Sequence, residues 1–218
     1  MSREPRISHV VWDWNGTILD DNDAVVSAVN AVCAAFGRDT IDLAYWRSIY
    51  RRPLSEGYQR LLGRELSAQD WFEIDRVYHE AYRALLPTTR LAPGIPDELH
   101  RWRDAGGQQS LLSMWFHDEL VPLVTQHGLA DLFIRIDGQR TDNGGHSKTN
   151  HLIEHLTVLR IDPTEVLVIG DVLDDAIAAK AAGVRCTLVT TGVMTRQALE
   201  ASGAPVVDSI AEALAGYA

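Results

Sequence analysis

In residues 7–17, ISHVVWDWNGT, a β-branched apolar run leads directly into an Asn-Gly turn, which predicts a buried strand and its end. Similar apolar runs that end in Gly, Ser or Asp recur along the chain, and helical patterns follow them. The further predicted strands are residues 109–113, 132–136, 166–169 and 184–189, with a short one at 205–207. Continuous apolar strands that alternate with helices are typical of a parallel sheet buried on both faces. The sequence therefore predicts the α/β class.

Residues 21–92 have a different pattern, because they show helical periodicity and no strand-like run. Within them, Ser67 and Asp70 form a variant capping box and predict the start of a long amphipathic helix that ends near Leu85. We therefore predict a small all-helical cap at 21–92, inserted after the first strand. The remaining residues, 1–20 and 93–218, are predicted to form a Rossmann-like parallel sheet core flanked by helices.

The charge balance of the chain limits its partners. Its 218 residues include 20 Lys and Arg against 30 Asp and Glu, a formal net charge of -10. This excess of acid argues against nucleic acid or an anionic membrane as partner. Cys33 and Cys186 lie too far apart in sequence to indicate a disulfide framework or a zinc site. No apolar run resembles a signal peptide or a membrane span, so we expect a soluble cytoplasmic protein, a monomer or a homodimer.

Polar residues gather where the predicted strands end. Ligands of open parallel sheets bind at the carboxyl ends of the strands, so these positions are the candidate site. The polar residues at these ends, together with a lysine at a predicted helix start, are Asp13, Asn15, Ser113, Lys148, Asp171 and Asp175.

Two of these carboxylates, Asp13 and Asp171, follow different strands and have little to neutralise them except Lys148. Like charges that converge raise a pKa or recruit a cation, and hard oxygen ligands favour Mg²⁺. A bound cation would also attract an anionic substrate to an acidic protein. Each residue alone has another interpretation: Asn15 as part of a turn, Asp171 as a helix cap, Lys148 as a solvated side chain. Their joint order and placement favour a functional site.

The arrangement resembles the haloacid dehalogenase-like (HAD) hydrolase superfamily. The similarity is to the subgroup with a helical cap after the first strand, which includes phosphoglycolate phosphatases and β-phosphoglucomutases. The residues that match the four motifs of the family are Asp13, Gly16-Thr17, Ser113, Lys148, Gly170-Asp171 and Asp175. The resemblance implies a Mg²⁺-dependent phosphatase that acts on a small phosphorylated metabolite, a phosphate ester.

The resemblance also implies a role for each matching residue. Asp13 would attack phosphorus and form an aspartyl-phosphate. Asp13, Asp171 and the backbone carbonyl of Asn15 would hold Mg²⁺, with Asp175 as a further ligand or as an orienting group. Lys148 and the metal would stabilise charge on the phosphoryl group. The Ser113 hydroxyl and a neighbouring backbone N–H, at Met114, would hold a phosphoryl oxygen.

One residue departs from the pattern of the family. Its phosphatases have a second Asp two residues after the nucleophile, which protonates the leaving oxygen and then activates water. This chain has Asn15 there, and an amide can do neither; such help is typically worth about 10²–10⁴-fold. His117 or His146 could replace the missing group. The alternative is a degenerate protein that binds a phosphorylated ligand or a protein partner without efficient turnover.

Two other reactions of the superfamily fit less well. Phosphonoacetaldehyde hydrolases form a Schiff base on a lysine of the cap, and residues 21–92 contain no lysine. Haloacid dehalogenases work without a metal and lack the paired acids that this chain has at Asp171 and Asp175. Residues 50–58 resemble a specificity loop, in which Arg51 or Arg52 could reach an anionic part of the substrate or could simply be solvated. The cap would move about hinges at 20–22 and 88–94.

Overall fold

The computed structural model describes residues 6–140 and 147–217, and its core is a parallel sheet in the order β5-β4-β1-β6-β7-β8. The strands of this sheet are β1 (His9–Trp12), β4 (Gln108–Phe116), β5 (Ile136–Gln139), β6 (Val166–Gly170), β7 (Arg185–Val189) and β8 (Val206–Val207). The predicted α/β fold with a parallel sheet is confirmed. The central position of β1 places the residue after it, Asp13, between the ends of β4 and β6.

Helices cover both faces of the sheet, which explains why its strands are apolar throughout. Val10 and Trp12 of β1 lie in a hydrophobic cluster with residues of α5, α6 and α10, whereas Val11 lies in a cluster with residues of α7 and α8. Successive side chains of a strand point to opposite faces, so both faces are buried. The helices of the core are α5 (Ile95–Asp104), α6 (His117–Gln126), α7 (Lys148–Leu159), α8 (Leu173–Ala182), α9 (Arg196–Glu200) and α10 (Ile210–Ala215), with short 3₁₀ turns η2 (Ala130–Leu132) and η3 (Pro163–Glu165).

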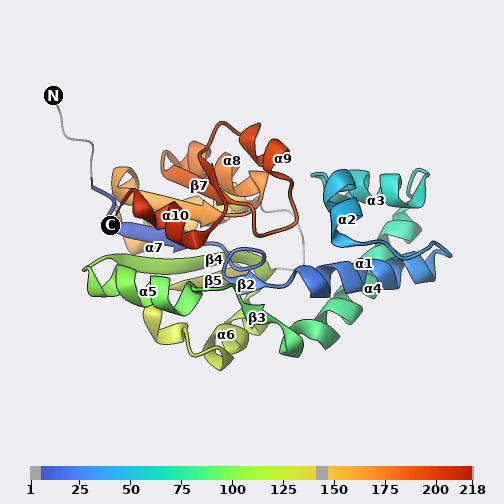
Figure 1. Ribbon diagram of the computed structural model, residues 1–218, viewed down its shortest axis with the longest axis horizontal. Helices are drawn as coiled ribbons and strands as arrows, with labels where there is room; N and C mark the ends of the chain where they lie inside the picture. Colours follow the sequence, from blue (N-terminus) through green and yellow to red (C-terminus); the bar gives the residue numbers. More distant parts are fainter. Residues whose placement is uncertain (1–5, 141–146, 218) are drawn as a thin grey trace.

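A separate group of helices, here called the helical unit, lies beside the sheet, at the right of the view in Figure 1. It consists of α1 (Asn22–Ala35), α2 (Leu43–Ile49), α3 (Leu54–Leu62) and α4 (Ala68–Leu85), followed by the turn η1 (Leu86–Thr88). The capping box predicted at the start of α4 is confirmed, because Ser67 and Asp70 hydrogen-bond each other's backbone N–H. No helix within the described residues is long and apolar enough to span a membrane.

Two details of the predicted secondary structure are wrong. The expected strand at 132–136 begins only at Ile136. Leu132 ends a 3₁₀ turn and Phe133 follows that turn, and both side chains are buried in the core cluster from outside the sheet. The connection at 88–94 contains the strand β3 (Arg90–Leu91), which pairs antiparallel with β2 (Leu19–Asp20). Arg90–Leu91 has no apolar run of the kind that indicated β8, so the sequence did not reveal this strand. The chain segments that enter and leave the helical unit therefore pair with each other as a two-stranded ribbon.

Candidate active site

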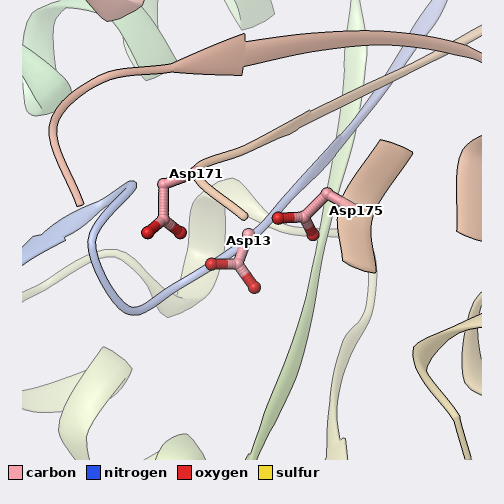
Figure 2. A group of neighbouring side chains, drawn as sticks. All are labelled: Asp13, Asp171 and Asp175. Atoms are coloured by element: carbon pink, nitrogen blue, oxygen red, sulfur yellow. The ribbon is translucent and has the colours of Figure 1, made fainter. Parts of the chain in front are cut away.

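Three carboxylates meet at the carboxyl end of the sheet. Asp13 follows β1 and still donates its backbone N–H to Ile169 of β6, Asp171 follows β6, and Asp175 lies in the first turn of α8. One carboxylate oxygen from each lies within 4.8 Å of the others, and Figure 2 shows Asp171 and Asp175 on either side of Asp13. All three side chains are buried. The structure thus brings together Asp13 and Asp171, which were predicted to converge, and it places Asp175 beside them.

Glycines make room for these carboxylates. A Cβ atom on Gly16, which has a φ of +72°, would lie 2.5 Å from Oδ2 of Asp171, and a Cβ on Gly192 would lie 1.7 Å from it. A Cβ on Gly170 would lie 2.2 Å from the carboxyl group of Asp175. Gly16 and Gly170 belong to the sequence motifs. The role of Gly192 was missed, although its place just after β7, another strand end, was the signal that could have found it.

A single lysine balances this cluster among the described residues. Lys148 is the first residue of α7, and its Nζ forms an ion pair with Asp13 and lies 2.5 Å from Oδ1 of Asp175. Burial alone would lower the pKa of Lys148, but the two carboxylates raise it above its ordinary value. Burial raises the pKa of Asp13 to about 6, against the opposing attraction of Lys148. Burial and the charges of its neighbours raise the pKa of Asp171 well above its ordinary value.

These charges fit a divalent cation. Three buried carboxylates face one ammonium group among the described residues, and burial raises the pKa values of Asp13 and Asp171, so a nearby cation would stabilise their ionised forms. Carboxylate oxygens are the ligands that hard cations such as Mg²⁺ prefer. The donor set could therefore hold such an ion.

Asn15 belongs to a hydrogen-bonded group that sequence reasoning missed. Its Nδ2 donates to Oδ2 of Asp21 at 3.1 Å and to the hydroxyl of Tyr82 at 2.7 Å, and that hydroxyl donates to Asp21 at 2.5 Å. Asp21 also accepts the backbone N–H of Gly16 at 2.9 Å. Burial raises the pKa of Asp21 above its ordinary value. The pair Asp20-Asp21 directly after the first motif was the available signal for this carboxylate.

A cavity of about 660 Å³ lies over the site, between the strand ends and the helical unit. Its lining includes seven of the predicted residues, namely Asp13, Asn15, Arg52, Ser113, Met114, Lys148 and Asp171. The Ser113 hydroxyl lies 3.5 Å from Oδ1 of Asn15 and accepts the backbone N–H of Trp115. Asp175 lies behind Lys148, against the inner part of the sheet.

Other predicted residues lie elsewhere. Arg51 donates to the backbone carbonyls of Ser48 and Tyr50 and is absent from the described lining of the cavity. His117 is also absent from that lining, and its Nδ1 accepts the backbone N–H of Gly138 at 3.2 Å. His146 lies outside the described residues. The histidine that does line the cavity is His79 of α4.

Comparison of the sequence with models of known protein families identifies the family of the chain. The family model described as "Haloacid dehalogenase-like hydrolase" matches residues 10–189. The chain therefore belongs to the haloacid dehalogenase-like hydrolase family.

Relatives and solved structures match most of the chain. Phosphoglycolate phosphatase 1 of Pseudomonas aeruginosa is 28% identical over 202 residues, covering 88% of this chain and 71% of the relative. Phosphoglycolate phosphatase of Chromobacterium violaceum is 28% identical over 215 residues and covers 94% of each chain. The crystal structure of a predicted phosphatase from Clostridium acetobutylicum has a TM-score of 0.83 and 20% identity, covering 97% of this chain and 98% of the other. At that identity, the structural match shows the fold alone.

Proposed function

We propose that this protein is a Mg²⁺-dependent phosphatase that hydrolyses a phosphate ester through an aspartyl-phosphate on Asp13. The observation that carries the proposal is the buried group of Asp13, Asp171 and Asp175 beside Lys148, at the floor of a cavity large enough for a small molecule. The phosphoglycolate phosphatases among its relatives support the same reaction class.

The metal would be held by Asp13, Asp171 and the backbone carbonyl of Asn15, with Asp175 orienting Lys148. When bound, Mg²⁺ supplies positive charge that neutralises the oxygens of the phosphoryl group during transfer.

The chain's own residues carry the covalent chemistry. A carboxylate oxygen of Asp13 attacks phosphorus, the bond from phosphorus to the ester oxygen breaks, and the organic group leaves as an alkoxide that takes up a proton. Water then cleaves the aspartyl-phosphate and releases inorganic phosphate, which restores the Asp13 carboxylate. The ammonium of Lys148 binds a phosphoryl oxygen, and the Ser113 hydroxyl with the Met114 N–H holds another.

Asn15 cannot supply the proton that the alkoxide takes up, because an amide does not ionise near neutral pH. Its amide instead donates hydrogen bonds to Asp21 and Tyr82 and so orients these groups. We therefore expect esters with a good leaving group, such as p-nitrophenyl phosphate, to react faster than alkyl esters.

The helical unit would act as a cap. We propose a cap domain at 21–92 and a catalytic core at 1–20 and 93–218, because the cavity lies between these parts and the β2–β3 ribbon joins them. Arg52 lines the cavity from the cap side, with its Nε 3.4 Å from Asp174. Closure of a cap excludes water from the reacting groups.

The test is hydrolysis of p-nitrophenyl phosphate, combined with acid quenching to trap a phosphoenzyme. We expect EDTA to abolish turnover and Mg²⁺ to restore it, and we expect Asp13→Asn to lose both turnover and trapped phosphate. Asp23→Asn, at an exposed aspartate of α1, is the matched control and should behave as the wild type. Full turnover without a divalent metal, or near-normal turnover by Asp13→Asn, would contradict the proposal.

The hydrogen bonds of Asn15 favour one second candidate, a protein that binds a phosphorylated ligand or a protein partner without efficient turnover. This candidate requires that no ester is hydrolysed with Mg²⁺ present, while calorimetry still shows binding of inorganic phosphate.

A further inference from the structure

One face of α4 forms a wall of the cavity. The residues of this helix that line the cavity are Trp71, Ile74, Asp75, Tyr78, His79 and Tyr82. Their spacing of three or four residues places them on a single helical face. From Trp71 to Tyr82 this wall is about 16 Å long, at a rise of 1.5 Å per residue. The α4 wall, as we call it, thus extends well beyond the reacting phosphate.

The α4 wall begins at the catalytic groups and is largely aromatic. Tyr82 hydrogen-bonds Asn15 at one end, and the Tyr78 ring stacks on it with centroids 5.8 Å apart and planes within 8°. At the other end Trp71 packs against Tyr58, with ring centroids 6.1 Å apart, and remains 37% exposed. Trp115 faces Tyr82 from β4, with centroids 5.1 Å apart. An organic group attached to the phosphate would therefore lie along aromatic rings.

The charges around the cavity disfavour a second anionic group on the substrate. Among the described lining residues, the permanent cations are Arg52 and Lys148, and both already have carboxylate partners. Asp75, with a side chain 57% exposed, adds negative charge on the α4 wall itself. A substrate carboxylate would lose its hydration here without gaining a free cation, which is unfavourable.

The volume leads to the same conclusion. Pockets of 300–1,000 Å³ typically enclose ligands of drug size, and this cavity measures about 660 Å³. A two-carbon acid such as glycolate would leave most of that space to water and most of the α4 wall uncovered.

We propose that the site takes phosphate monoesters whose organic group carries an aromatic or similarly large apolar ring and no carboxylate. The inference rests on the proposed phosphatase function and specifies its substrate class. The ring binds along the α4 wall between Tyr78 and Trp71, while the phosphate lies at Asp13 and Lys148.

The test compares three esters that all release a primary alkoxide, so that leaving-group protonation affects them alike: ethyl phosphate, 2-(1-naphthyl)ethyl phosphate and 2-phosphoglycolate. We expect the KM of the naphthyl ester to be at least about tenfold below that of ethyl phosphate, because a ring is buried. We expect 2-phosphoglycolate to have the lowest kcat/KM. A kcat/KM for 2-phosphoglycolate equal to or above that of the naphthyl ester would overturn the inference.

Two adjacent aromatic residues of α4 provide a matched pair of variants. Trp71 lines the cavity, whereas Phe72 is 63% exposed and absent from the described lining. Trp71→Ala should narrow the KM difference between the naphthyl and ethyl esters to less than about threefold. Phe72→Ala should leave that difference intact. If Trp71→Ala also left it intact, the ring would not reach the α4 wall and the inference would fail.

Binding to the full-length Asp13→Asn variant separates this inference from the proposed function. If the wild type hydrolyses no ester, yet the variant binds the naphthyl ester at least about tenfold more tightly than ethyl phosphate in calorimetry, the phosphatase proposal fails and the substrate class stands. If the wild type hydrolyses all three esters with equal kcat/KM, the phosphatase proposal stands and the substrate class is wrong.

Discussion

At the scale of single residues, the chemistry of the site follows from an imbalance of charge, because among the described residues Lys148 is the one cation paired with the cluster of Asp13, Asp171 and Asp175. Burial raises the pKa of Asp13 and the pKa of Asp171, and a bound cation would lower both. An acid at position 15 would add another carboxylate beside the buried Asp21. The amide of Asn15 avoids that repulsion and gives Asp21 a hydrogen-bond donor instead.

Exchanging the groups at positions 15 and 21 tests this interpretation. Asn15→Asp would place a carboxylate where Nδ2 now lies 3.1 Å from Asp21, and we expect the free energy of unfolding to fall by about 1–3 kcal/mol. Asp21→Asn in the same chain should recover most of that loss, because the pair again has one acid and one amide. Urea unfolding of the wild type, both single variants and the double variant measures the coupling, expected to be at least about 1 kcal/mol. Strictly additive changes would show that the two side chains do not interact.

The same double variant carries an acid at the position of the missing proton donor. We expect its kcat for ethyl phosphate to exceed that of the wild type by at least about tenfold. An unchanged kcat would mean that leaving-group protonation does not limit the reaction.

Gly192 tests the space around Asp171. A Cβ at this position would overlap Oδ2 of Asp171, and the backbone there does not have a positive φ, so Gly192→Ala should displace the carboxylate without straining the chain. We expect the Mg²⁺ concentration for half-maximal turnover to rise by at least about tenfold, the usual effect of disturbing a ligand's support. Gly216→Ala, which meets nothing within 4 Å, is the control. An unchanged Mg²⁺ concentration for half-maximal turnover would show that Asp171 is not a ligand of the metal.

At the scale of elements, the central strands and α7 are joined by a buried polar chain. His9 of β1 lies 2.7 Å from the Ser110 hydroxyl of β4, which lies 2.7 Å from His155 of α7, and His155 lies 2.8 Å from Asp137 of β5. Burial, and secondarily the neighbouring His155, lowers the pKa of His9 to about 4. Because α7 also carries Lys148, this chain fixes the helix that supplies the site's ammonium group.

His9 should make stability depend on pH. Its pKa is 6.5 in the unfolded chain and about 4 in the fold, so the unfolded state takes up the proton first as the pH falls. The neutral form of His9 therefore stabilises the fold above pH 6.5, and this contribution is lost as the pH falls towards 4. The free energy of unfolding should fall by about 2 kcal/mol between pH 7 and pH 5 on account of this group. His9→Gln should remove that part of the slope in urea unfolding, and His100→Gln, at an exposed histidine, should not. Equal slopes in the wild type and in His9→Gln would contradict the assignment.

At the scale of the whole molecule, residues of the helical unit and of the core line the same cavity. Nε and Nη2 of Arg47, on α2, donate to the backbone carbonyl of Gly192 at 3.0 and 2.5 Å. Gly192 is the residue that leaves space for Asp171, so this contact links the position of the helical unit to the carboxylate cluster. Arg83 on α4 adds a more exposed ion pair with Glu119 on α6.

Loss of the Arg47 contact should weaken closure more than folding. We expect Arg47→Met to lower kcat/KM for p-nitrophenyl phosphate by about tenfold, since charge-assisted hydrogen bonds contribute about 1.5–3 kcal/mol and this one spans the proposed cap and core. Arg76→Met removes an exposed arginine of α4 that pairs only with Glu73 and Glu80 among the described contacts, and kcat/KM should stay unchanged. Limited proteolysis should cut the connection at 88–94 faster in Arg47→Met alone. Equal effects of the two variants would show that the Arg47 contact does not hold the cap.

The α/β class, the helical insertion and the group of Asp13, Ser113, Lys148 and Asp171 could be predicted from the sequence, because each depends on local periodicity or on motifs at strand ends. The distant residues that surround that group could be identified only in the folded chain. Tyr82 contacts Asn15 across 67 residues of chain, and the aromatic face of α4 lines the cavity only because the helical unit lies next to the strand ends. Such contacts depend on how the elements pack, and no local pattern records that packing.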